Sequence, residues 1–146
     1  WAIGVIAEIA LFIALPQVMK RWSIERILLA SFACAALRFA LIAWGIGSLT
    51  LLAVAQLMHA ITFGAFHAAG VAAMHRIFRG PSQARGQALY TSLGYGAGGT
   101  LGTLAAGALW EPAGGAVTFT LAGAMAGVGW LLLRRSPAHA GGQGTA

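Results

Sequence analysis

The chain alternates between long runs of apolar residues and short polar connections. A helix needs about 20 apolar residues to cross the hydrocarbon core of a bilayer, which is about 30 Å thick. Five runs reach that length, and they cover residues 1–19, 27–46, 50–75, 86–110 and 116–133. The pattern predicts an all-α membrane protein in which residues 1–135 form a bundle of five transmembrane helices. Residues 136–146 contain Pro137 and end in small residues, so they are predicted to be a disordered cytoplasmic tail.

The basic residues fall in alternate connections. Eight of the nine Lys and Arg residues lie in the first connection, in the third connection or directly after the last run: Lys20, Arg21, Arg26, Arg76, Arg79, Arg85, Arg134 and Arg135. The second and fourth connections contain no basic residue. Because basic residues mark the cytoplasmic side of a membrane protein, this alternation fits five crossings and predicts a cytoplasmic C-terminus.

The composition excludes several classes of protein. Hydrophobic residues make up 59% of the 146 residues and charged residues 8%, whereas soluble domains carry about a quarter charged residues. The lipid bilayer is therefore the expected surrounding of most of the chain. The net charge of +6 does not indicate a nucleic-acid partner, because no basic stripe is interleaved with exposed aromatic residues. The only cysteine, Cys34, cannot form an intramolecular disulfide or a metal cluster.

Two charged residues lie in the middle of apolar runs. Glu8 and Arg38 each lie eleven residues from the inner ends of their predicted helices, residues 19 and 27. At about 1.5 Å per residue, both lie ~16 Å above the inner boundary and so at the same depth. A lone charge at the bilayer centre costs roughly 2.5–3.5 kcal/mol on insertion scales. The sequence leaves two interpretations open: a structural ion pair, or a pair that lines a polar translocation cavity.

The third run carries a polar and aromatic stripe. Its members recur three or four residues apart, which places them on one helical face: Gln56, His59, Phe63, His67 and Gly70. The stripe predicts a cavity wall. The two histidines are eight residues apart and no Cys or Asp joins them, so no metal and no cofactor is expected.

Small residues recur in the last two runs at the spacing that lets helices approach closely in lipid. Packing is therefore the role expected for five glycines: Gly94, Gly98, Gly102, Gly123 and Gly127. Residues 94–99 also match G-x-G-x-x-G, but no strand precedes them, so a dinucleotide site is not predicted. The surroundings of Ser92 lack the G-x-S-G turn of an intramembrane serine protease, and no enzyme activity is expected.

Five segments of the chain form a pattern that is shared with a known family. They are Trp-Ala-Ile-Gly-Val-Ile-Ala-Glu (residues 1–8), Arg-Trp-Ser (21–23), Arg38, Gln-Leu-Met-His-Ala-Ile-Thr-Phe (56–63) and Arg-Gly-Gln-Ala-Leu-Tyr (85–90). Together they resemble the C-terminal half of a major facilitator superfamily transporter, in the branch of lactose permease, phenylpropionate permease and the nucleoside proton symporters. The resemblance covers all of the chain except the tail and matches helices eight to twelve of twelve. The chain also opens at Trp1, inside an apolar run, so we expect a piece of a longer polypeptide.

The resemblance implies roles for particular residues. In lactose-permease-like members, the position that matches Glu8 contacts substrate and takes part in proton coupling. The position that matches Arg38 pairs with an acid, and the position that matches His59 helps to bind substrate. Thr62 stands where the sugar symporter carries a glutamate, so sugar transport by the same mechanism is not expected. Phe63 and His67 continue the same wall of the pathway.

The resemblance implies proton-coupled symport of a small organic solute, and an aromatic or other organic acid is the favoured substrate. Transport would proceed by alternating access, with the substrate bound between this half and an N-terminal half that is missing here. The expected location is the bacterial cytoplasmic (inner) membrane. The alternative is a five-helix membrane scaffold or assembly subunit that does not transport, with its polar stripe buried in a partner interface.

Overall fold

The computed structural model describes residues 2–136, and these residues are arranged as helices joined by short turns. The elements are α1 (Ala2–Arg21), α2 (Ile24–Trp44), α3 (Leu49–Leu57), the π-helix η1 (Ala60–Ala65), α4 (Phe66–Ile77), the 3-10 helix η2 (Gly80–Ser82), α5 (Gln83–Tyr90), the π-helix η3 (Thr91–Gly98) and α6 (Gly99–Arg135). No strand occurs in residues 2–136, so the all-α prediction is confirmed for them. The predicted disordered tail lies outside the described residues, apart from Ser136.

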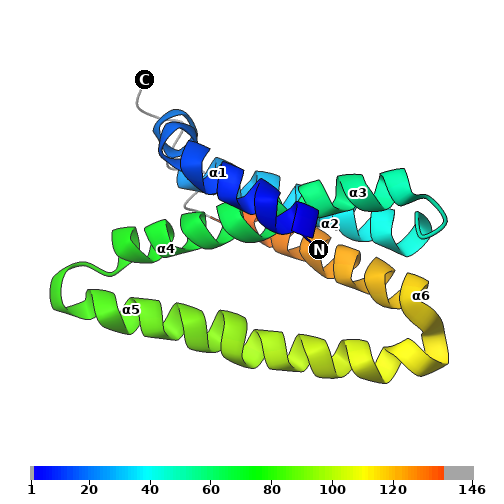
Figure 1. Ribbon diagram of the computed structural model, residues 1–146. Helices are drawn as coiled ribbons and strands as arrows, with labels where there is room; N and C mark the ends of the chain where they lie inside the picture. The colour runs from blue at the N-terminus through cyan, green and yellow to red at the C-terminus, as the bar shows by residue number, and fades with distance from the viewer. Residues whose placement is uncertain (1, 137–146) are drawn as a thin grey trace.

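Four helical stretches in the described part of the chain are long and apolar enough to cross a membrane. They are Ala2–Arg21, Ile24–Trp44, Leu49–Ile77 and Gly80–Arg135. The last has 56 residues, far more than the roughly 20 that one crossing needs. It contains a non-helical residue, Gly114, and the ribbon turns back on itself at the yellow corner of Figure 1. The predicted runs 86–110 and 116–133 lie on either side of this break, and the count of five crossings stays a prediction.

Local sequence explains where the helices begin and reverse. Ser23 precedes α2 and its hydroxyl accepts a hydrogen bond from the Arg26 amide at 3.3 Å, while Ser48 caps α3 in the same way through Leu51 at 3.4 Å. Serine is favoured at this position because its oxygen satisfies an amide that has no partner in the first turn. Gly114 has φ 76° and ψ 168°, a conformation that is essentially restricted to glycine. The chain therefore reverses at Gly114, where the residue is a glycine that can adopt this conformation.

Two contacts organise the bundle. The helix α2 packs against the second part of α6, where the rings of Phe39 and Phe119 stack with centroids 6.2 Å apart. The helix α1 packs against α3 and η1 through two glycines: a Cβ on Gly4 would lie 3.3 Å from Gln56 Oε1, and a Cβ on Gly64 would lie 3.1 Å from Leu11 Cδ2. Large apolar side chains elsewhere remain exposed, among them Ile13, Ile46, Leu49 and Leu101. An apolar exterior of this kind fits contact with a lipid bilayer.

The glycines predicted to pack helices behave differently from one another. A Cβ on Gly123 would lie 3.3 Å from the Ala36 carbonyl oxygen, so this glycine does lie at the contact between α6 and α2. A Cβ on Gly94, Gly102 or Gly127 would meet no neighbour within 4 Å, and one on Gly98 would meet a backbone oxygen of its own π-helix. The expected packing at these four glycines is therefore not seen in the part of the chain that the structure describes.

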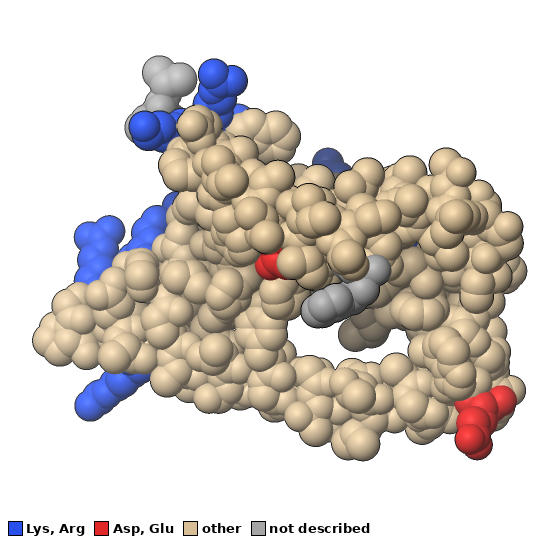
Figure 2. Space-filling view, viewed as in Figure 1, with Lys and Arg blue, Asp and Glu red and all other residues tan. Residues whose placement is uncertain are grey.

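Charge and hollows are unevenly distributed over the molecule. Figure 2 shows most Lys and Arg side chains gathered at the left end, where α1 ends and where α4 turns into α5. We call this the basic end. The same view shows an opening between the long lower helix, which runs from α5 into α6, and the helices above it. The lower helix is thus held mainly at its two ends.

Candidate functional site

The Arg38 side chain reaches from α2 to the middle of the Leu49–Ile77 span. Its Nε donates a hydrogen bond to the Ala55 carbonyl oxygen at 3.0 Å, and its Nη1 donates one to Thr62 Oγ1 at 3.3 Å. The Thr62 hydroxyl in turn donates to the His59 carbonyl oxygen at 3.2 Å. Both acceptors of the guanidinium are uncharged, and hydrogen bonds to charged groups contribute about 1.5–3 kcal/mol. Arg38 is therefore fixed in orientation while its positive charge is not neutralised by either partner.

The ion pair expected between Glu8 and Arg38 is not formed in the described residues. There the salt bridge joins Glu25 and Arg76 instead. Glu8 is half-buried on α1, and its Cγ would lie 3.3 Å from a Cβ on Gly64. The glutamate thus faces η1, whereas Arg38 faces Ala55 and Thr62.

Three members of the predicted stripe form a ladder of rings. The His59 and Phe63 rings lie 5.4 Å apart between centroids at an angle of 9°, and Phe63 and His67 lie 6.5 Å apart at 13°. Gln56 lies at the start of this ladder, where α1 covers it: a Cβ on Gly4 would lie 3.3 Å from Gln56 Oε1 and 3.5 Å from the His59 Cβ. The structure therefore places Gln56, His59, Phe63 and His67 along one path, which α1 covers at its Gln56 end.

Two tyrosines of the fourth run, Tyr90 and Tyr95, complete this path. The Tyr95 hydroxyl and His67 Nδ1 are 2.9 Å apart and share a hydrogen bond. The Tyr95 ring lies edge-on to Phe63, at 6.3 Å between centroids, and Tyr90 lies edge-on to Tyr95 at 5.8 Å. The Tyr90 hydroxyl and His59 Nδ1 are buried without a hydrogen-bond partner within residues 2–136. We call Phe63, His67, Tyr90 and Tyr95 the aromatic cluster.

The π-helix η3 explains how these two tyrosines come together. Tyr90 and Tyr95 are five residues apart, which puts them on different faces of an α-helix of 3.6 residues per turn. A π-helix forms hydrogen bonds from residue i to residue i+5 and brings such residues onto one face. The signal available in the sequence was the glycine-rich stretch between residues 94 and 99, where the backbone has few steric constraints.

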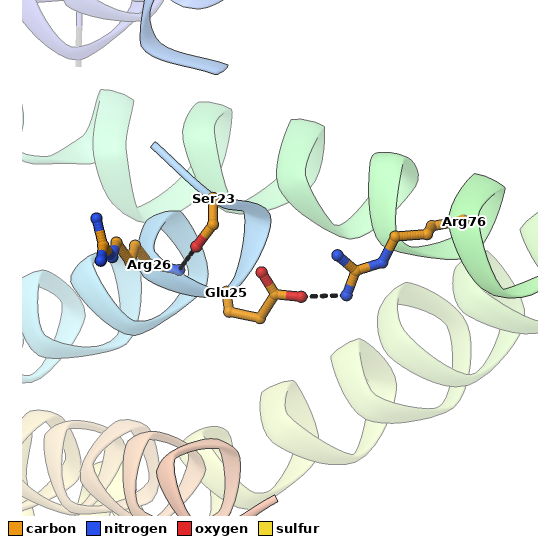
Figure 3. A network of polar contacts seen from close by, with 4 residues as sticks. All are labelled: Ser23, Glu25, Arg26 and Arg76. Atoms are coloured by element: carbon orange, nitrogen blue, oxygen red, sulfur yellow. Dashed lines mark hydrogen bonds and ion pairs between the residues drawn. The ribbon is translucent and has the colours of Figure 1, made fainter. Parts of the chain in front are cut away.

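A second polar contact lies at the basic end. Figure 3 shows Glu25 in the first turn of α2 pointing toward Arg76 in the last turn of α4, where the two side chains form an ion pair. Each charge also has the sign that its helix end favours, because helix N-termini attract anions and C-termini attract cations. The Arg76 side chain is 52% exposed, so the pair joins the two helix ends without being buried.

These features define a class of protein: an integral, multi-pass membrane protein of helices with polar and ionisable groups inside its apolar spans. Within residues 2–136, no three His, Cys, Asp or Glu side chains are grouped as metal ligands would be.

The chain belongs to the MFS_1 like family, whose model matches residues 1–121. It is 32% identical over 128 residues to a probable 3-phenylpropionic acid transporter of Escherichia coli (strain K12). That alignment covers 84% of this chain and 32% of the relative, so the chain spans about a third of the relative's length. No solved structure matches the chain. Family and relative point to a transport protein of the major facilitator superfamily rather than to an enzyme.

Proposed function

We propose that the chain is part of a secondary active transporter that carries a small organic acid together with a proton by alternating access. The observation that supports this most is the state of Arg38, which is held by two uncharged acceptors and by no carboxylate of the described residues. A guanidinium oriented in this way is suited to bind a carboxylate through paired hydrogen bonds. The relative's name, a probable 3-phenylpropionic acid transporter, favours an aromatic acid as the substrate.

In this proposal His59 and Glu8 also take part in transport. The substrate carboxylate binds Arg38 near His59, and Glu8 carries or gates the proton. Glu8 suits this role because it is a half-buried intramembrane acid without an ion-pair partner among residues 2–136. Intramembrane carboxylates commonly serve as proton relays. The other half of the cavity would come from an N-terminal part of the same polypeptide, as the relative's greater length suggests.

Uptake measurements test the role of Arg38. In cells that express the complete transporter, Arg38→Gln should abolish uptake of radiolabelled 3-phenylpropionate, because the anion loses its charged partner. Arg135→Gln removes the same charge from the end of α6 and should leave uptake unchanged. If Arg38→Gln reaches the membrane and still transports at the normal rate, the proposed anion site is wrong.

A matched pair of carboxylates tests the proton step. Glu8→Gln should abolish uptake driven by a proton gradient while leaving exchange of labelled for unlabelled substrate. Glu111→Gln removes an acid from the stretch that precedes the reversal at Gly114 and should change neither activity. Full gradient-driven uptake by the Glu8→Gln variant would refute the assignment.

The proposed topology has five crossings, a cytoplasmic C-terminus and a location in the bacterial inner membrane. Single cysteines introduced at Ser82 and at Glu111 in a Cys34→Ser background test it with a membrane-impermeant thiol reagent. The cysteine at position 111 should react in intact cells, and the one at position 82 only after the membrane is opened. Reaction of both from the same side would exclude the reversal of the chain between them.

A five-helix scaffold is the alternative that family membership disfavours, because the matching family and relative are transport proteins. A reading frame that continues upstream of Trp1 through seven further apolar helices is the finding expected for the transporter. A start codon directly upstream would favour the scaffold instead.

A further inference from the structure

The aromatic cluster has a closed end and an open end. At the closed end, Tyr90 packs over Gly70 so tightly that a Cβ on that glycine would lie 2.5 Å from the tyrosine hydroxyl oxygen. At the open end, Phe63 is 44% exposed and Tyr95 is 38% exposed. The exposed corner between Phe63 and Tyr95 is therefore available to another group.

The shape of this corner suits a third aromatic ring. Phe63 and Tyr95 meet at an angle of 80°, so a ring seated between them would meet the two at different angles. Offset-stacked and edge-to-face arrangements are the ones that aromatic rings prefer. The hydrogen bond between Tyr95 and His67 fixes the tyrosine ring in this position. The corner is thus preformed.

The corner also has space beside it. An open hollow is lined by Tyr95, Gly99, Thr100, Thr103 and Leu104. A Cβ on Gly99 would meet no neighbour within 4 Å, so the side of the hollow formed by Gly99 is not filled by a side chain of the described residues. Binding sites for small molecules have this character, with apolar walls and a few placed polar groups.

The corner lies one step along the ring ladder from the cationic group. Phe63 follows Thr62, which accepts the Arg38 hydrogen bond, and the ring of Phe63 is 5.4 Å from that of His59. A carboxylate at Arg38 and His59 would therefore leave an aryl group, joined to it by a short alkyl linker, at Phe63 and Tyr95.

We infer that Tyr95, positioned by His67, determines specificity by binding the aryl ring of the substrate together with Phe63. This inference rests on the proposed function, since it assigns the second end of the organic acid whose first end binds Arg38. Tyr95 selects for the aromatic ring and is not required for binding the carboxylate.

Competition between an aryl and an alkyl acid tests this assignment. The complete transporter is assayed for uptake of 3-phenylpropionate and of butyrate, and the ratio of the two values of kcat/KM is compared among variants. Tyr95→Leu should lower the preference for the aryl acid roughly 3- to 10-fold, which is the range for loss of one aromatic contact. Tyr95→Phe keeps the ring but loses the hydroxyl that bonds to His67, so its preference should fall between that of the unaltered protein and that of Tyr95→Leu. Leu132→Ala removes an exposed apolar side chain of α6 that does not line the hollow, and its ratio should be unchanged.

The outcomes separate this inference from the proposed function. If the unaltered protein takes up no 3-phenylpropionate, the proposed substrate class and this inference both fall. If it does, and Tyr95→Leu keeps the same ratio, only the assignment of Tyr95 is refuted. Should Tyr95→Leu not accumulate in the membrane, His67→Phe decides the point. It keeps a ring on α4 but removes the hydrogen bond that positions Tyr95, so it should raise KM for the aryl acid and leave that for butyrate unchanged. If His67→Phe and the unaltered protein have equal KM values for 3-phenylpropionate, the role of Tyr95 is refuted.

Discussion

A methyl group added at Gly70 probes the contact that closes the aromatic cluster. The Cβ of Gly70→Ala would lie 2.5 Å from the Tyr90 hydroxyl oxygen and 2.7 Å from its Cζ. Non-bonded heavy atoms of this kind normally lie about 3.5–4.0 Å apart. The tyrosine or the backbone of α4 must therefore move by about 1 Å. Overpacking of this kind costs about 1–3 kcal/mol.

The control for this substitution lies in the same chain. Replacement of glycine by alanine inside a helix gains about 0.8–1.0 kcal/mol of helix propensity, and this gain partly hides the collision. Gly102 lies in α6 and a Cβ there would meet nothing within 4 Å, so Gly102→Ala shows the propensity gain alone. The expected difference between the two variants is the collision itself, about 1–3 kcal/mol.

The assay is unfolding of the purified protein in one detergent, followed by tryptophan fluorescence as a function of temperature or of added sodium dodecyl sulfate. Each variant is measured again in a Tyr90→Ala background, where the collision is removed. The difference between Gly70→Ala and Gly102→Ala should then disappear, since coupling energies vanish when the contact is absent. If the two glycine variants are equally stable while Tyr90 is still present, the contact between α4 and α5 is refuted.

Three further predictions concern the polar contacts and the reversal of the chain. Glu25→Gln and Arg76→Gln should each cost about 0.2–1 kcal/mol of stability, measured by the same unfolding assay at low salt. The double variant should cost no more than either single one, and additive losses would contradict the ion pair. Thr62→Val leaves one guanidinium hydrogen of Arg38 without its acceptor and should lower the free energy of unfolding by about 0.6–1.7 kcal/mol. Thr62→Ser keeps the hydroxyl and should not lower it. Equal unfolding midpoints for these two variants would contradict the hydrogen bond. Gly114→Ala forces alanine into a glycine-only conformation and should cost about 1–3 kcal/mol, so an unchanged melting temperature would contradict the backbone found there.

The sequence could predict the depth of the charged groups but not the direction in which they point. Counting residues placed Glu8 and Arg38 at one level of two neighbouring predicted helices. Rotation about the helix axis decides which side chains meet, and no periodic apolar face fixes this rotation in a helix that is apolar all round. Arg38 therefore meets the Ala55 carbonyl and Thr62, two partners that its depth alone could not indicate.

Glycine spacing likewise could not indicate which glycines have a neighbour within the described residues. A regular G-x-x-x-G series indicates a helix face that allows close approach, yet it does not say whether a neighbouring helix is present. Gly94 and Gly102 belong to such a series and meet no neighbour in the described part of the chain, whereas Gly64 and Gly70 belong to none and lie against α1 and Tyr90. Bulky partners on the opposing helix, not the interval between glycines, determine which glycines pack.

The absence of the Glu8–Arg38 pair makes the site more suitable for binding an anion. An arginine already paired with a glutamate must break that pair before it binds a carboxylate, and the loss offsets much of the gain. Arg38 instead donates to a backbone carbonyl and a hydroxyl, which orient it without cancelling its charge. In the proposed function, an anion bound at Arg38 would relieve part of the cost of that charge in the membrane, which is roughly 2.5–3.5 kcal/mol.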